Sequence, residues 1–128
     1  MVSEITAGIE VSVQTMYQDG HSAPDENRFV FAYKISISNH NDHTVQLLSR
    51  RWIITNGIGG VEIVEGEGVV GRQPVLYKGD MHEYVSGCNL ITPFGTMEGS
   101  YFFQNKATQE IFEVNIPLFK LEATFALN

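Results

Sequence analysis

The sequence predicts an all-β domain, an antiparallel β-sandwich of the immunoglobulin or fibronectin type III kind with about seven or eight strands. Two observations predict this fold. Apolar and polar residues alternate in several short runs, and Gly, Pro, Asn and Asp gather between those runs. No window repeats apolar residues at the spacing of a helix, so we expect almost no helix. A small β-barrel has the same pattern and is the alternative architecture.

The first half of the chain carries the clearest strand signals. Alternation over 8–16 predicts a half-buried strand, and the turn-rich stretch 19–27 leads to the most regular run, 29–38. The next strand covers 45–54, where a slip in the alternation at Leu47 and Leu48 predicts a β-bulge. The glycines of 56–60 predict a hairpin turn before a short strand at 61–64.

The second half contains longer loops. Three glycines and a proline make 66–74 loop-like, and 75–77 has a short strand-like pattern. A brief alternation over 81–86 predicts a short strand, and 87–95 is interpreted as a turn. Two strands, 97–104 and 112–118, complete the predicted sandwich.

Length and charge limit the possible functions. The 128 residues suit a single domain, 1–128, and 43% hydrophobic residues are enough to bury a core. The net charge of −7 repels phosphate backbones, so we expect no nucleic-acid partner. No signal-peptide pattern and no apolar run near the roughly 18 residues of a membrane span are present, so we expect a cytoplasmic protein without a membrane partner. One cysteine allows no intrachain disulfide and fits a reducing compartment.

Residues 66–71 match the GxGxxG pattern of phosphate-binding loops. A dinucleotide-binding site also needs a following helix, which Pro74 and the strand-like segment after it exclude. Two interpretations remain. In the first, the loop amides at the glycines bind an anion together with Arg72, although neighbouring glutamates would repel that anion. In the second, which the residues favour, the loop is purely structural.

Two other groups of residues could carry chemistry. His40 and His43 flank Asp42 at a spacing that could hold a metal ion, but no further ligand is near, so we predict a solvated turn and no metal site. Cys88 could act as a nucleophile if His82 served as its base, but a lone cysteine is more often buried and inert. We therefore predict no catalytic residue, no cofactor and no enzymatic activity.

Arg50 and Trp52 share one face of their predicted strand, and Arg51 points to the other. Arg50 could bind a carboxylate or phosphate, and Trp52 could anchor a partner. The favoured interpretation places Trp52 in the core with the arginine stem packed along the same surface.

Several segments together resemble the ApaG family of small bacterial proteins. They are LLSRRWIIT (47–55), GEGVVGRQP (66–74), EYVSGC (83–88), TPFGTMEGSY (92–101) and FEVNIPLF (112–119). The resemblance covers nearly the whole chain, with small departures such as Asn56 where the family usually has Asp.

The resemblance implies a fibronectin type III-like sandwich with no established catalytic activity. ApaG-like domains also occur appended to F-box proteins and to a DNA-polymerase-interacting protein, which implies a recognition role. The family is linked to cobalt and magnesium sensitivity, and its glycine loop is discussed as a binder of pyrophosphate-like groups. For this chain, that loop implies backbone contacts from Gly66, Gly68 and Gly71.

Our leading hypothesis is a non-enzymatic module that contacts an unknown protein partner through exposed Val69 and Val70. The alternative is a binder of pyrophosphate or a nucleoside polyphosphate through the loop 66–71, with Arg72 supplying positive charge.

Overall fold

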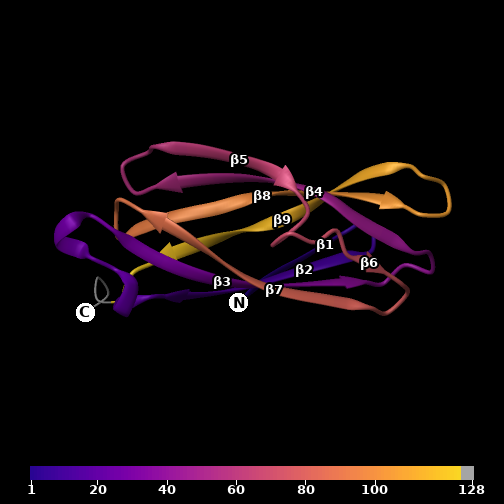
Figure 1. Ribbon diagram of the computed structural model, residues 1–128, viewed down its shortest axis with the longest axis horizontal. Coiled ribbons are helices and arrows are strands. Elements are labelled where there is room, and N and C mark those ends of the chain that lie inside the picture. The colour runs from indigo at the N-terminus through magenta and orange to yellow at the C-terminus, as the bar shows by residue number, and fades with distance from the viewer. Residues whose placement is uncertain (125–128) are drawn as a thin grey trace.

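The computed structural model describes residues 1–124 and contains two facing antiparallel sheets (Figure 1). In spatial order, the first sheet consists of β1 (Val2–Thr6), β2 (Ile9–Tyr17), β3 (Phe29–Asn39) and β7 (Met81–Leu90). The second consists of β5 (Val61–Glu67), β4 (Val45–Asn56), β8 (Phe94–Asn105) and β9 (Ile111–Glu122), with β6 (Val75–Leu76) pairing the start of β4. The predicted sandwich is confirmed, because each sheet keeps two outer strands where a barrel would close.

Within residues 1–123, helix is confined to two three-residue 3-10 turns, η1 (Asp19–His21) and η2 (Pro24–Glu26), inside the predicted turn-rich stretch. Neither these nor any other part of residues 1–124 forms a helix long and apolar enough to cross a membrane.

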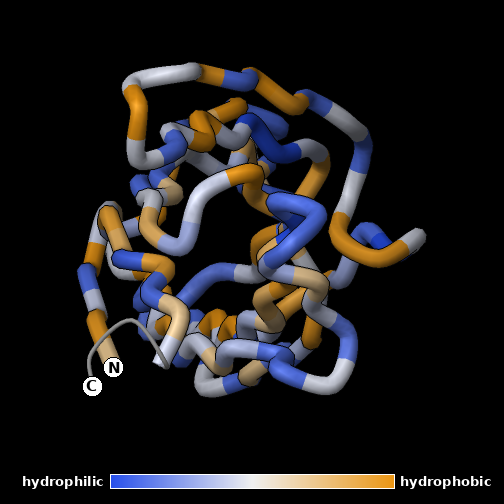
Figure 2. The backbone as a smooth tube through the Cα atoms, turned by 90° about the vertical axis from the view of Figure 1, so that its left-hand side faces the viewer, coloured by the Kyte–Doolittle hydropathy of each residue, from blue (hydrophilic) through white to orange (hydrophobic). Residues whose placement is uncertain are grey.

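The alternation of β3 explains how the layers pack. Its odd-numbered residues from Phe29 to Asn39 are all buried, and the even-numbered ones are half-buried or exposed. Trp52 of β4, 3% exposed, meets this face from the other sheet, with its ring centroid 5.5 Å from Tyr33 and 5.8 Å from Phe119. The core position predicted for Trp52 is therefore confirmed. Seen from the end in Figure 2, the chain forms two layers that face each other.

Two irregularities interrupt the register of the second sheet. The register between β4 and β8 shifts between Leu47 and Ser49, which confirms the predicted bulge. A second shift, between β8 and β9, lies between Met97 and Gly99. A Cβ on Gly99 would lie 2.0 Å from the Arg51 carbonyl oxygen, so β4 and β8 approach closely there because the side chain is absent.

Two expectations about strand limits are wrong. The strand predicted at 81–86 continues to Leu90, and the turn expected over 87–95 is limited to the residues between β7 and β8. Gly87 and Asn89 are residue types typical of turns, but here they occupy exposed positions of the strand while Cys88 and Leu90 point inward. β1 was not predicted, because most of its side chains are exposed and its sequence shows no apolar alternation. With β1 and the short β6, residues 1–124 contain nine strands.

β5 and β7 are outer strands of different sheets, and a cleft of about 470 Å³ is lined by residues of both. The fold thereby leaves one edge of the sandwich open beside the glycine loop.

Candidate binding site at the glycine loop and the β5/β7 cleft

The end of the glycine loop is a tight reverse turn. The Val69 amide donates to the Arg72 carbonyl at 2.8 Å, and the Arg72 amide donates back to the Val69 carbonyl at 3.0 Å. The two central residues have positive φ, 48° at Val70 and 74° at Gly71. Two such residues between a mutually bonded pair are typical of a type I′ hairpin turn.

Each glycine of the GxGxxG pattern has a structural reason. Gly68 has a φ of 63°, and a Cβ there would lie 2.2 Å from the Arg72 carbonyl oxygen. Gly66 makes room for Arg50, since a Cβ would lie 2.9 Å from both Nη atoms of its guanidinium. Gly71 faces open space and is needed only for its positive φ.

Three amides of the loop already have backbone partners. The Gly68 amide donates to the Leu48 carbonyl at 2.8 Å, and those of Val69 and Arg72 bond each other. Within residues 1–124, this leaves the amides of Val70 and Gly71 and the exposed Arg72 side chain for an anion. Glutamates of β5 precede the loop. Pyrophosphate binding through this loop therefore stays a prediction.

The structure separates the two valines expected on a partner surface. Val69 is only 1% exposed and belongs to the core, so its expected exposure is wrong. The turn reverses the chain at this point, so Val69 points inward and the next side chain projects outward. Val70 is 62% exposed.

Arg50 connects the loop to the cleft. Its Nη1 donates to the carbonyls of Glu67 at 3.0 Å and Gly68 at 2.9 Å. No carboxylate of the described residues lies within 4 Å of the guanidinium. The side chain is half-buried and lines the β5/β7 cleft. Arg50 is therefore a fixed positive charge in a concave site. Binding of a carboxylate or phosphate by Arg50, one of the two interpretations of this residue from the sequence, stays a prediction.

The cleft combines an apolar floor with polar walls. β4 contributes alternate inward residues, and β5 and β7 contribute the two sides. The lining residues from these strands are Arg50, Trp52, Ile54, Glu62, Val64, Ser86, Gly87, Cys88 and Asn89.

His82 and Cys88, the pair considered but not favoured for nucleophilic chemistry, are not brought together. His82 and Cys88 lie six residues apart on the same strand, which separates them by about 20 Å. Burial, followed by the charge of Glu62, raises the pKa of the Cys88 thiol to about 11, the opposite of what a nucleophile needs. Burial, followed by the charge of Arg72, lowers the pKa of His82. The interpretation of Cys88 as a nucleophile with His82 as its base is therefore wrong.

The two histidines of the turn after β3 do not form a metal site. His40 Nε2 lies 2.9 Å from the Glu10 carboxylate on the neighbouring strand. Throughout residues 1–124, no group of three or more His, Cys, Asp or Glu side chains is placed to hold a metal ion.

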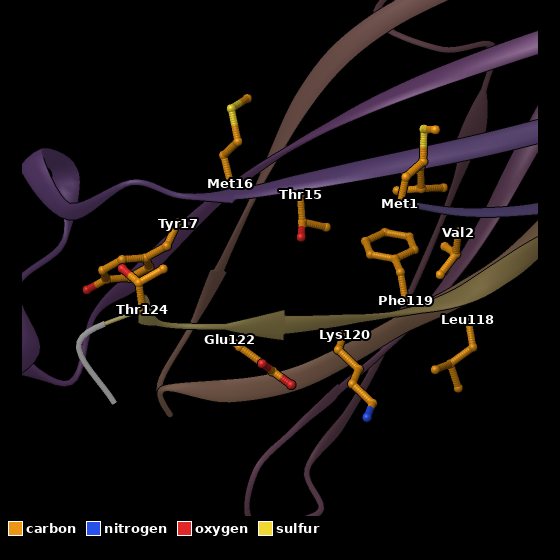
Figure 3. Close-up of a pocket in the computed structure, with 11 residues that line it drawn as sticks. Met1, Val2, Thr15, Met16, Tyr17, Leu118, Phe119, Lys120, Glu122 and Thr124 are labelled. Atoms are coloured by element: carbon orange, nitrogen blue, oxygen red, sulfur yellow. The ribbon is translucent and has the colours of Figure 1, made fainter. Parts of the chain in front are cut away.

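A larger cavity, of about 710 Å³, lies at the opposite side of the sandwich, between β2 and β9. Figure 3 shows Phe119 pointing toward β2, whereas Leu118 and Lys120 point away from it. None of the site residues predicted from the sequence lines this cavity.

Comparison with known proteins identifies the family. The model of the ApaG domain matches residues 19–105, which include the glycine loop and every residue that lines the cleft. The chain belongs to the ApaG family. The resemblance inferred from its sequence segments is thereby confirmed.

Relatives that match over nearly their whole length support the same family assignment. The chain is 50% identical over 122 residues to the protein ApaG of Mesorhizobium japonicum, covering 95% of this chain and 93% of the relative. It is 47% identical over 123 residues to that of Paramagnetospirillum magneticum, covering 96% and 94%. A crystal structure of an ApaA protein from Bordetella pertussis superposes with a TM-score of 0.86 at 45% identity, covering 89% of this chain and 92% of that one.

Proposed function

We propose that this ApaG-family chain is a non-enzymatic module that binds a protein partner through the surface around Val70. The observation that carries the proposal is the conformation of Val70 itself. A β-branched residue at positive φ is a backbone outlier that costs roughly 1–2 kcal/mol. Such strain is concentrated at functional sites.

The side chain that bears this cost is exposed. A type I′ turn favours Asn before Gly, so the backbone alone would favour Asn-Gly rather than Val70-Gly71. An exposed valine in this position has no packing role that would offset the strain, which favours a contact with another molecule.

Nearby residues in the chain extend this apolar character. Val75 and Tyr77, on the connection from β5 to β7, and Met81, the first residue of β7, are also exposed. We propose that these exposed side chains contribute to the same partner-binding surface as Val70, since exposed apolar patches mark such surfaces. We call this set, Val70, Val75, Tyr77 and Met81, the Val70 surface.

Replacing Val70 by Asn separates binding from folding. Val70→Asn relieves the strained backbone, so we expect a higher melting temperature, together with at least tenfold weaker partner binding, equivalent to about 1.4 kcal/mol. A photo-crosslinking residue at position 70 identifies the partner in cells, and titration calorimetry then compares the affinities of the wild type and variant.

Ile58→Asn is the matched control. Ile58 is 78% exposed in the turn between β4 and β5, and its replacement removes an equally apolar side chain. We expect it to leave the affinity unchanged. Equal affinity for Val70→Asn and the wild type, or an equal loss with Ile58→Asn, would contradict the proposal.

A further inference from the structure

We propose that the β5/β7 cleft binds an extended peptide segment of a protein partner, with a carboxylate of that segment on Arg50 and a basic side chain toward Glu62. This inference rests on the proposed function, because it names the chemistry of a protein partner. It concerns a different surface, the cleft rather than the Val70 surface.

Arg50 forms the positive end of the cleft. The Nη1 hydrogens are used by the Glu67 and Gly68 carbonyls, whereas Nη2 and Nε have no partner within residues 1–124. The two carbonyls hold the guanidinium in place, so binding would cost little side-chain entropy. A planar guanidinium with two free donor atoms matches the geometry of a carboxylate.

Glu62 forms the negative end. On β5, Glu62 pairs with Ile54 of β4. Gly66 of β5 pairs with Arg50 of β4, and the Arg50 guanidinium packs against Gly66. Four residues of strand separate these two positions, a distance of about 13 Å. Glu62 has no cationic side chain within 4 Å in the described part of the chain. The cleft therefore has uncompensated charges of opposite sign at its two ends.

The space between the charges suits an extended chain. Trp52 and Val64 form an apolar floor there, and they face each other in the β4–β5 register. Each flanking strand, β5 or β7, is the last of its sheet and has unpaired backbone groups along its outer edge. An extended peptide can pair with such an edge while its alternate side chains enter the groove. A free small carboxylate would satisfy Arg50 but leave Glu62 unpaired.

Three acetylated synthetic peptides test the inference. The first is Lys-Thr-Val-Thr-Val with a free C-terminal carboxylate, which places the basic residue four positions from the acid. The second is Lys-Thr-Val-Thr-Glu with an amidated C-terminus, and the third is the first peptide amidated. Trp52 is the chain's single tryptophan and lines the cleft, so its fluorescence reports binding.

We expect a saturable fluorescence change with the first or second peptide and none with the third. Stronger binding of the first identifies a C-terminal carboxylate as the ligand, and stronger binding of the second identifies an acidic side chain. Arg50→Gln and Glu62→Gln should each weaken binding at least tenfold. Glu62 makes no contact with the glycine loop, so its variant tests the cleft even if Arg50→Gln disturbs that loop.

Neighbouring residues on the outer face supply matched controls. Arg51 and Glu65 pair with each other there, Nε to Oε1 at 3.4 Å, and Arg51→Gln and Glu65→Gln should leave peptide binding unchanged. No saturable change at millimolar peptide, or equal weakening by these controls, overturns the inference. If the peptides do not bind but Val70→Asn weakens partner binding, only the proposal for the cleft is overturned. If the peptides bind but Val70→Asn leaves partner binding unchanged, only the proposal for the Val70 surface is overturned.

Discussion

Single residues in this protein take their properties from burial more than from residue type. Cys88 is the clearest case, because its sequence context allowed both a nucleophile and an inert thiol. Its side chain points from β7 toward the other sheet, and its pKa is raised to about 11. Asn39 is a second case: this polar residue at the end of β3 is fully buried, and its side-chain amide donates to the carbonyls of His43 and Leu76, each at 3.0 Å.

The raised pKa of Cys88 predicts slow alkylation. An increase from the ordinary value of 9.0 to about 11 reduces the thiolate fraction about 100-fold at pH 8. We therefore expect the folded protein to react with iodoacetamide at least 100-fold more slowly than the same protein unfolded in guanidinium. Mass spectrometry of timed samples measures both rates. Similar rates in the two states would show that Cys88 is accessible and reactive.

At the scale of elements, the loop between β5 and β6 depends on two kinds of glycine. Gly68 is surrounded by backbone and has positive φ, whereas Gly71 has positive φ in open space. The same substitution therefore has different consequences at the two positions, although the sequence pattern treats both as equivalent members of GxGxxG.

Alanine substitutions separate these roles. We expect Gly71→Ala to lower the free energy of unfolding by about 1–2 kcal/mol, the cost of a left-handed backbone for an L-residue. Gly68→Ala should cost more, because its Cβ would lie 2.2 Å from the rigid Arg72 carbonyl oxygen. Urea denaturation measures both. Equal losses would mean that the loop relaxes freely around position 68.

At the scale of the whole molecule, a pair of tyrosines joins the two sheets. Tyr84 of β7 and Tyr101 of β8 share a hydrogen bond between their hydroxyl groups in the interior. Burial is the largest cause of the raised pKa of both side chains, so both hydroxyls stay protonated at neutral pH. Each hydroxyl is therefore the hydrogen-bond partner of the other in this largely buried position.

A double-mutant cycle tests this coupling. Tyr84→Phe and Tyr101→Phe each leave one buried hydroxyl without its partner, so each should cost about 1–3 kcal/mol of unfolding free energy. The double variant leaves neither unpaired and should cost less than the sum of the two. Chemical denaturation gives all four values, with Tyr77→Phe, which is 63% exposed, as a near-neutral control. Additive losses would contradict coupling between the hydroxyls.

Local patterns predicted much of this fold. The alternation of β3, the bulge at Leu47 and the core position of Trp52 could be predicted because strand periodicity links neighbouring residues directly to opposite faces. The end of β7 could not, because Gly87 and Asn89 are residue types typical of turns and only the pairing with β3 shows that they belong to the strand. β1 was missed for a similar reason, since most of its side chains are exposed and it is held by backbone pairing with β2.

The sequence by itself determined the fold class, the family and the position of the glycine loop, because these follow from periodicity and short segments. Only the tertiary structure decided which residues of that loop face outward, since one reverse turn buries Val69 and exposes Val70. It also placed Arg50 and Glu62 at opposite ends of one cleft. The physical reason is that charge, solvation and contact depend on distances between strands of different sheets, and the register and packing that set those distances arise when the sandwich closes.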